Sequence, residues 1–470
     1  MNTPLPAGFR IELAPDVKQL TEDAWFGGSP SRVLRLTAAG RSAWEELASG
    51  PVRTPAAATL ARRLTDTGFA HPCPPAPTTP PDVTVVVPVR DRAAALGRCL
   101  AALGNRHPVV VVDDGSHDPR AVAEVAARHG AKLLVRTVNG GPGAARDTGL
   151  GAARSALVAF VDSDCVPPAG WLDGLVPHLA DPLVAAVAPR IVASGQSAGW
   201  PARFASALDL GDRPASVAPN TRVAYVPTAA LLVRRGALDA VARGGAVFDP
   251  GLRVTGEDVD LVWRLHEAGW RIRYEPSVEV PHEEPASWAA LLRRRYRYGL
   301  SAAPLARRHP GSVPPLVLFG WPAATVLALL ARKPVLAAAA YGCSVLEIAR
   351  TLRAAGLPTT GVLSAMGRAA HQTWLGVGRY GTQFAAPLLA VELLAGRHRL
   401  AAASLLFGPP LTEWARQGRG RLDPARYVLG RVADDVAYGG GVLAGCLAER
   451  TLAPVRPRLG RRPLRIDRRG

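Results

Sequence analysis

The chain has 470 residues, of which 48% are hydrophobic and 20% are charged, so a wholly disordered chain is excluded and two to four folding units are expected. The formal net charge of +18 comes almost entirely from arginine, because the only lysines are Lys18, Lys132 and Lys333. This excess favours anionic partners, namely a nucleotide diphosphate, a nucleic acid or an acidic lipid surface, although an arginine-rich codon usage also contributes.

The five cysteines are dispersed along the chain and lack CxxC pairing; they are Cys73, Cys99, Cys165, Cys343 and Cys446. We therefore expect neither a disulfide framework nor a structural zinc site, as is typical of a reducing cytoplasm. The first residues show no basic flank followed by an apolar core, so no secretory signal is expected. The catalytic part is predicted to stay in the cytosol.

Residues 1–70 are predicted to form a small α+β module. Strands are expected at 9–13 and 33–36, a turn at 27–30, and helices at 37–47 and 55–67, in a winged-helix-like order. Such a module binds DNA or a peptide, or serves only for packing. Residues 71–82, which include six prolines, predict a stiff linker and a domain boundary.

Residues 83–305 are predicted to form a doubly wound α/β domain with a mostly parallel sheet, because strands alternate with helices. Strands are expected at 83–89, 109–112, 132–136 and 158–161, and helices at 92–103, 119–129 and 147–153. From about residue 185 to residue 300 we expect an added region for the acceptor substrate. Ligands of such sheets bind beyond the carboxyl ends of the strands, so polar residues at those ends are the candidates for function.

Residues 306–470 are predicted to form an apolar, arginine-rich helical region. The nineteen residues 313–331 carry no charge and reach the length of a membrane span, although three prolines weaken a straight helix. Further apolar runs follow at 334–346 and 384–411. Residues 415–470 hold 13 arginines and five acidic residues, which favours an anionic cytoplasmic membrane surface over the alternative of a buried helical subdomain.

Two carboxylates follow the strand at 158–161, in the sequence VAFVDSDCVP. Asp162 and Asp164 lie one residue apart where the backbone turns, and such a pair can share Mg²⁺ or Mn²⁺ with a diphosphate. The alternative is a polar turn, since Asp and Ser form local hydrogen bonds there. Taken alone, the pair does not decide between a metal site and a turn.

Earlier strands end in the same way. Pro88, Arg90 and Asp91 end the first strand, and Asp113 and Asp114 end the second, where carboxylates can accept hydrogen bonds from uracil or ribose unless they only form Asx turns. A glycine-rich stretch at 139–147, with Gly143 and Arg146, opens a helix and allows close approach to a diphosphate. It matches neither a dinucleotide fingerprint nor a P-loop.

Three later features complete the candidate site. Glu257 and Asp258 open a helix, where they either cap it or, kept ionised by the helix dipole, provide a base for a sugar hydroxyl. His282 follows a strand and is either structural or a metal ligand. The basic and aromatic segment 293–299, with Arg295, is either solvated or clamps the diphosphate or the acceptor.

The order of these motifs resembles the family 2 glycosyltransferases of the GT-A fold. The resemblance implies that Asp91, Asp113 and Asp114 hold the nucleoside, that Asp162, Asp164 and His282 bind Mg²⁺ or Mn²⁺, and that Asp258, with Glu257 second, is the catalytic base. The contact of Asp147, where the family often has Asn, stays open. The QxxRW motif of processive polysaccharide synthases is not present in the chain. The nucleotide-sugar contacts are thus expected at Pro88, Arg90, Asp91, Asp113, Asp114, Gly143, Arg146, Asp162 and Arg295.

Over nearly its whole length the chain resembles the pre-mycofactocin glycosyltransferase family. The motifs that carry this resemblance are GGSPSRVLRLTAAG, HPCPPAP, VVVVDDGS, NGGPGAARDTG, FVDSDC and VTGEDVDLVWRL. It implies an inverting transfer of glucose from UDP-glucose to a peptide-derived cofactor precursor, followed by β-1,4-linked glucose additions, at the cytoplasmic face of the membrane. The alternatives are a lipid-linked acceptor and a non-catalytic nucleotide-binding membrane scaffold. Nucleic acid is not an expected partner, because the basic residues gather far from the N-terminal module.

Overall fold

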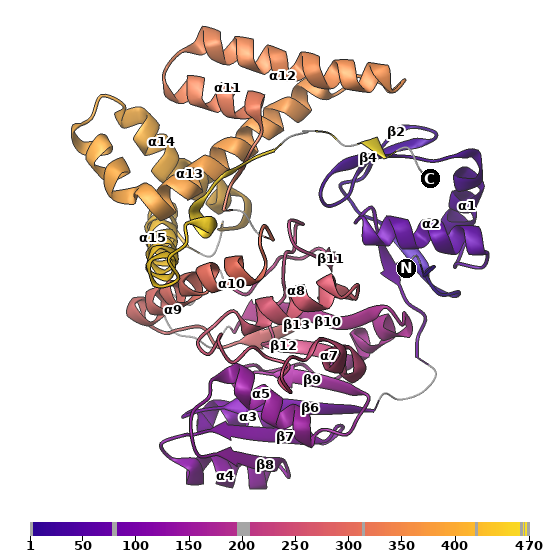
Figure 1. Ribbon diagram of the computed structural model, residues 1–470, viewed down its shortest axis with the longest axis vertical. Helices are drawn as coiled ribbons and strands as arrows, with labels where there is room; N and C mark the ends of the chain where they lie inside the picture. Colours follow the sequence, from indigo (N-terminus) through magenta and orange to yellow (C-terminus); the bar gives the residue numbers. More distant parts are fainter. Residues whose placement is uncertain are drawn as a thin grey trace.

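The computed structural model describes residues 3–77, 82–194, 207–312, 315–418, 422–460, 464, 466 and 467. Figure 1 shows a small N-terminal module, a central sheet flanked by helices, and a helical region on the far side of the sheet from α4 and β8. The C-terminal end of the chain returns to the N-terminal module (Figure 1). The first and last segments of the chain therefore lie side by side.

The central sheet has eight strands in the order β11-β13-β10-β12-β9-β6-β7-β8. Strands β9, β6, β7 and β8 are parallel neighbours, and β10 and β13 are also parallel, whereas β12 and β11 run antiparallel to their neighbours. The predicted α/β class with a mostly parallel sheet is confirmed. The strands are β6 (Val83–Val89), β7 (Val109–Asp114), β8 (Lys132–Arg136), β9 (Leu157–Val161), β10 (Val184–Ala193), β11 (Ala215–Val217), β12 (Ala230–Arg234) and β13 (Arg271–His282).

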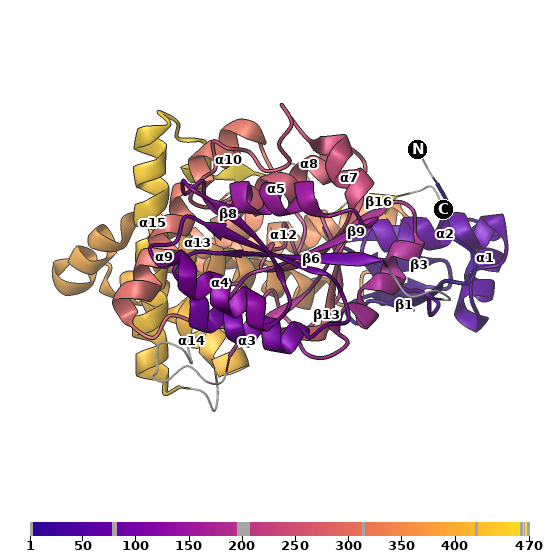
Figure 2. The same ribbon diagram turned by 90° about the horizontal axis from the view of Figure 1, so that it is seen from below.

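Helices cover both faces of this sheet, which explains the unbroken apolar run of β6. Val86 belongs to one core, whereas Val85 and Val87 belong to the core on the opposite face. Figure 2 shows α3 and α4 on one side and α5, α7 and α8 on the other. These helices are α3 (Ala93–Leu103), α4 (Pro119–Arg128), α5 (Pro142–Ala152), α7 (Arg235–Val241) and α8 (Glu257–Glu267).

The N-terminal module contains the two predicted helices and more strands than the sequence indicated. Thr37 and Thr54 cap the helices, because each side-chain oxygen accepts a hydrogen bond from a backbone N–H of the first turn. Strand β5 pairs with β1, so the predicted linker 71–82 begins later than expected, and residues 78–81 lie outside the described residues. The elements are β1 (Arg10–Leu13), β2 (Lys18–Thr21), β3 (Ala24–Gly27), β4 (Arg32–Arg35), α1 (Ala38–Ser49), α2 (Pro55–Asp66) and β5 (Ala70–Cys73).

Contacts on three sides fix this module to the rest of the chain. Arg62 forms a buried bidentate ion pair with Asp181 of the sheet domain, at 2.7 and 2.8 Å. The C-terminal strand β16 (Ile466–Asp467) pairs in parallel with β4. Ala24 and Val33 pack in one apolar cluster with residues of the helical region. Side-chain and strand contacts, as well as the linker, therefore attach the N-terminal module to the other two regions.

The helical region differs from the prediction in its first segment. Residues 317 and 318 form strand β14, paired with β15 (Arg458–Leu459), and the following helix α11 (Gly320–Leu330) has only eleven residues. The prediction of one apolar segment of membrane-spanning length at 313–331 is therefore wrong. Residues 313 and 314 lie outside the described residues. Among the described residues one helix, α12 (Pro334–Ala354), has the length and composition to cross a membrane.

The remaining helices enclose the space beyond the sheet. They are α9 (Trp288–Leu300), α10 (Ala302–Arg308), α13 (Val362–Ala395), α14 (Arg399–Glu413) and α15 (Pro424–Ala448). Glycines bring α15 unusually close to α9: a Cβ atom on Gly299 would lie 2.2 Å from the carbonyl oxygen of Tyr438, and one on Gly441 would lie 2.0 Å from that of Tyr296. Only glycine fits at these positions, so the helical region is fixed directly to the sheet domain.

Candidate functional site

The loop that follows β9 is joined to the end of β13, and this joins two predicted metal ligands. The backbone oxygen of Asp164 accepts a hydrogen bond from the N–H of Glu283, and Cys165 bridges to His282. As a result, Asp164 Oδ1 lies 3.6 Å from His282 Nε2. Arg92, which the sequence analysis did not select, also pairs with the carboxylate of Asp164.

His282 is buried and held in one orientation. Its Nδ1 lies 3.3 Å from Oε1 of Glu284, which is itself buried and paired with Arg294. Burial lowers the pKa of His282, but the hydrogen bond with Glu284 and the negative charge of Asp164 more than offset it, so that pKa lies above its ordinary value. A carboxylate on one ring nitrogen, with the other facing Asp164, is the arrangement in which a histidine binds a metal.

Arg146 connects the β9 loop to α8. Its buried guanidinium group donates to Oδ1 of Asp162 at 2.6 Å and to Oε1 of Glu257 at 2.8 Å, and it packs over the ring of Phe248. The glycine-rich start of α5 allows this packing, since a Cβ atom on Gly143 would lie 2.9 Å from Phe248. Arg146 thus holds both acids in place and balances part of their negative charge.

Among the described residues, no arginine or lysine forms an ion pair with Asp258 of α8. Its side chain is enclosed by protein except toward the two pockets described below. This desolvation, followed by the charge of Glu257, raises the pKa of Asp258 to about 7. Burial thus acts against the expected effect of the helix dipole, and a pKa of about 7 leaves the carboxylate partly ionised at neutral pH. A pKa near neutrality suits a general base.

A pocket of about 840 Å³ gathers these side chains at the carboxyl ends of the strands, and we call it the sheet-edge pocket. Its charged lining consists of Arg92, Arg98, Arg146, Asp162, Asp164, Glu257, Asp258, His282, Glu283, Glu284, Arg293, Arg294 and Arg297. Of the predicted residues, the structure brings six together at this pocket, namely Arg146, Asp162, Asp164, Glu257, Asp258 and His282. Mixed arginines and carboxylates of this kind can hold a diphosphate and a cation together.

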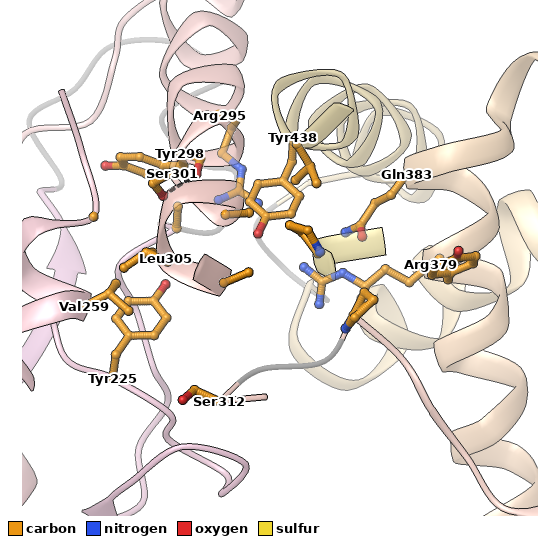
Figure 3. A pocket seen from close by; sticks show the side chains of 18 of the residues that line it. Tyr225, Val259, Arg295, Tyr298, Ser301, Leu305, Ser312, Arg379, Gln383 and Tyr438 are labelled. Carbon is orange, nitrogen blue, oxygen red and sulfur yellow. Dashed lines mark hydrogen bonds between the residues drawn. The ribbon is translucent and has the colours of Figure 1, made fainter. Parts of the chain in front are cut away.

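A larger cavity of about 1510 Å³ lies between the sheet domain and the helices α9, α10, α13 and α15, and we call it the bundle cavity. Figure 3 shows side chains that line it. The two pockets share four residues, namely Leu208, Thr255, Asp258 and Tyr298. Asp258 therefore faces both of them and stands at their junction.

The acids of the first two strands lie at the same edge of the sheet but do not line the sheet-edge pocket. Asp91 accepts a hydrogen bond from the backbone N–H of His117, and Arg90 lies 3.6 Å from it. Asp113 accepts from Ser116, and Asp114 accepts from the backbone of the glycine-rich loop and from Arg136. Their hydrogen bonds shape the loops around the pocket.

Three further residues considered as nucleotide-sugar contacts interact with the protein itself. Pro88 is buried within β6. Asp147 accepts hydrogen bonds from the backbone N–H groups of Val247 and Phe248. Arg295 points away from the sheet-edge pocket and pairs with Asp434 of α15 at 2.6 Å, so it lines the bundle cavity. Helical rotation explains this, because residues 293, 294 and 297 of α9 face the sheet-edge pocket instead.

The donor set at Asp164 and His282 fits a divalent cation only in part. No group of three or more His, Cys, Asp or Glu side chains able to hold an ion occurs in the part of the chain that the structure describes. Asp164 and His282 supply two ligands, Glu284 orients the histidine, and Asp162 lines the same pocket. A phosphate-bearing ligand fits this arrangement, because its oxygens complete the coordination that the protein leaves open.

A mostly parallel sheet with carboxylates and arginines gathered at one edge agrees with the class of protein that the comparisons give, a glycosyltransferase. The family model described as "Glycosyltransferase like family 2" matches residues 80–300. The chain belongs to the family 2 glycosyltransferases.

Of the similar proteins, one matches nearly the whole chain. The chain is 37% identical to the pre-mycofactocin glycosyltransferase of Mycobacterium tuberculosis, over 97% of this chain and 99% of that protein. It is 27% identical to the glycosyltransferase AglE of Haloferax volcanii, over 47% of this chain and 72% of that protein. Among solved structures, the mannosyltransferase PcManGT of Pyrobaculum calidifontis, in complex with GDP-Man and Mn²⁺, gives a TM-score of 0.45 at 22% identity, covering 78% of this chain and 89% of that one.

Proposed function

We propose that the protein transfers glucose from UDP-glucose to the peptide-derived mycofactocin precursor and then extends it with β-1,4-linked glucose. The similarity to the pre-mycofactocin glycosyltransferase over nearly the whole of both chains supports this choice of pathway. One observation carries the transferase mechanism: the Asp258 side chain stands where the sheet-edge pocket and the bundle cavity meet.

The sheet-edge pocket is the proposed donor site. The diphosphate of UDP-glucose lies among its arginines, and Asp91, Asp113 and Asp114 are the proposed contacts of the nucleoside. Asp162, Asp164 and His282 would hold Mg²⁺ or Mn²⁺, which supplies positive charge for the leaving diphosphate. Arg146 keeps Asp162 and Glu257 in fixed positions beside the proposed diphosphate site.

The proposed reaction is a single displacement at the anomeric carbon. Asp258 accepts the proton of the acceptor hydroxyl while the oxygen forms a bond to that carbon from the face opposite the diphosphate. The bond between the anomeric carbon and the phosphate oxygen breaks, and its electron pair leaves with UDP. The configuration is inverted, and Asp258 later releases the proton to solvent. A pKa of about 7 lets this carboxylate both accept and release a proton near neutral pH.

The helical region supports a proposed location at an anionic membrane surface. The turn between α11 and α12 exposes Leu329, Val335 and Leu336 and carries Arg332 and Lys333 between them. Exposed apolar side chains next to basic ones bind the interface of acidic lipids. Sedimentation with phosphatidylserine vesicles tests this: binding supports it, and recovery of the protein in the supernatant contradicts it.

A lipid-linked acceptor is the second candidate, and the length and composition of α12 favour it. The first experiment therefore offers purified protein a panel of UDP-sugars with Mn²⁺ and either the soluble precursor or a membrane extract. The proposal expects a hexose-sized mass increase of the soluble precursor with UDP-glucose and without detergent. A product only with lipid acceptors would favour the second candidate, and no UDP release with any acceptor would contradict both.

A further inference from the structure

The bundle cavity is larger than an ordinary small-molecule pocket and opens next to Asp258. Its volume of about 1510 Å³ exceeds the ~300–1,000 Å³ that is usual for a drug-sized ligand. It reaches from Asp258 on α8 to Gln383 on α13 and to Tyr438 on α15. The cavity is therefore large enough to take a ligand that extends beyond the reacting hydroxyl group.

Aromatic side chains line the part of this cavity nearest to Asp258. Figure 3 shows Tyr225 of the sheet domain on one side of this space, and Tyr438 of α15 with Gln383 and Arg379 of α13 on the other. Arg295 lies between two of the rings, 5.9 Å from the centroid of Tyr298 and 5.2 Å from that of Tyr438. Flat rings beside hydrogen-bonding groups suit sugars, whose C–H faces pack on aromatic rings.

Two arginines that line the cavity beside Tyr438 and Gln383 are paired with acids of α15. Arg295 pairs with Asp434 at 2.6 Å, and Arg379 pairs with Asp435 at 3.2 Å. Such pairs leave little net charge for a phosphate, but their remaining N–H groups and lone pairs can bond to hydroxyl groups. Burial, followed by the charge of Asp258, raises the pKa of Tyr225, so its hydroxyl stays neutral. The middle of the cavity thus suits a neutral ligand rich in hydroxyl groups.

The wall that carries Tyr438 is held rigidly relative to Asp258. Gly441 and Gly445 of α15 pack against the backbone of α9, where added Cβ atoms would lie 2.0 Å from the Tyr296 oxygen and 2.7 Å from the Leu300 oxygen. Asp260, two residues after Asp258, is fixed in turn by Arg264 and by His309, at 2.8 and 2.9 Å. The two sides of the cavity therefore keep a defined spacing.

We propose that the bundle cavity binds the saccharide chain already attached to the acceptor, with Tyr438 as a stacking surface and Gln383 as a hydrogen-bonding residue. This inference rests on the proposed function, because it takes Asp258 as the base that faces the terminal hydroxyl. It adds that the enzyme recognises the products of its own earlier additions. A cavity of this size explains how the same site accommodates an acceptor that grows.

The test uses the full chain and cellotetraose, a β-1,4-linked glucose tetramer, in isothermal titration calorimetry with UDP and Mn²⁺ present. We expect saturable binding to the wild type and at least a tenfold weaker affinity in Tyr438→Ala. Tyr438→Phe, which keeps the ring, should bind as tightly as the wild type. Tyr296→Ala is the matched control, because Tyr296 lies on α9 with an exposed side chain and does not line the cavity.

Each outcome decides one of the two proposals. Absence of tetramer binding to the wild type, or equal affinity in Tyr438→Ala, overturns the saccharide site even if the precursor is glycosylated. Tetramer binding without any glucose transfer contradicts the proposed function and leaves the saccharide site standing. Should Tyr438→Ala fail to fold, as its melting temperature will show, Gln383→Ala replaces it, with the same expected loss and the same contradicting result.

Discussion

The sheet-edge pocket and the bundle cavity meet at Asp258 but are built in different ways. The first consists largely of side chains at the ends of neighbouring strands, where the topology of the sheet gathers them. The second needs the sheet domain together with the later helices α9, α10, α13 and α15, and glycine contacts hold α15 against α9. The proposed donor half of this site is thus a property of the fold, whereas the proposed acceptor half depends on how the helical region packs.

The largest effect is expected from a substitution of Asp258, where the two pockets meet. Asp258→Asn should lower kcat by about 10²–10⁴-fold, the usual contribution of a general base, with little change in the KM for UDP-glucose. Because burial raises the folded-state pKa of Asp258 to about 7, its ionised form destabilises the fold at pH 8, and the Asn variant should melt no lower there. Steady-state kinetics measure the loss of kcat, and thermal melts measure the stability. Wild-type turnover in Asp258→Asn would eliminate Asp258 as the catalytic base.

The second largest effect is expected on the donor side. Asp164→Ala removes the carboxylate beside His282 and should lower kcat/KM by about 10²-fold, with a higher concentration of Mn²⁺ needed for half-maximal rate. Asp173→Ala is a matched control, because this exposed acid of the same domain pairs only with Arg106 on the surface. An unchanged metal requirement in Asp164→Ala would show that the cation, if any, binds elsewhere.

The pH dependence distinguishes the base from its neighbours. With a pKa of about 7, Asp258 is mostly protonated below that pH, so kcat/KM should fall about tenfold for each unit of pH below 7. Above pH 7 the carboxylate is ionised and the rate should level off. A profile that stays flat down to pH 5 would mean that an acid with an ordinary pKa, or no acid at all, removes the proton.

Two arginines on α9 test whether the two pockets bind different substrates. Arg297 lines the sheet-edge pocket, whereas Arg295 lines the bundle cavity and pairs with Asp434. Arg297→Ala should raise the KM for UDP-glucose several-fold, and Arg295→Ala should raise the KM for the acceptor instead. Initial rates with each substrate varied in turn measure this. The opposite pattern would restore the original prediction that Arg295 contacts the diphosphate.

The smallest effect concerns the packing of the acceptor half. Gly441→Ala places a methyl group against the backbone of α9 and should destabilise the protein by about 1–3 kcal/mol. The KM for the acceptor should rise more than that for UDP-glucose, since α15 moves away from Asp258. Gly440→Ala is the control, because its Cβ would make only ordinary contacts, 3.8 Å from Tyr296. Equal melting temperatures of the two variants would contradict the close packing.

The sequence allowed the donor half to be predicted because its residues follow strands. Asp162 and Asp164 end a buried run of β9, and His282 ends β13, which the parallel pairing with β10 brings to the same edge. Arg295 was misplaced because the position of a residue around a helix depends on the partner helix. Tyr438 and Asp434 had no local pattern to mark them, as their role depends on packing against distant residues.

The tail shows the limit of composition as a guide. The uncharged residues 313–331 match a membrane span in composition, but β14 pairs with β15 and divides them. Nothing in the local sequence indicates a partner 140 residues away. The extra strands of the N-terminal module escaped prediction for a similar reason, since β5 pairs with β1 and β16 with β4 across long separations.

A crystal structure of the full chain with UDP, Mn²⁺ and cellotetraose tests the central claim most directly. We predict that the diphosphate lies among the arginines of the sheet-edge pocket and that the cation lies next to Asp164 and His282. The terminal sugar hydroxyl should lie within hydrogen-bonding distance of Asp258. A nucleotide bound elsewhere, or a saccharide whose end does not reach Asp258, would contradict it.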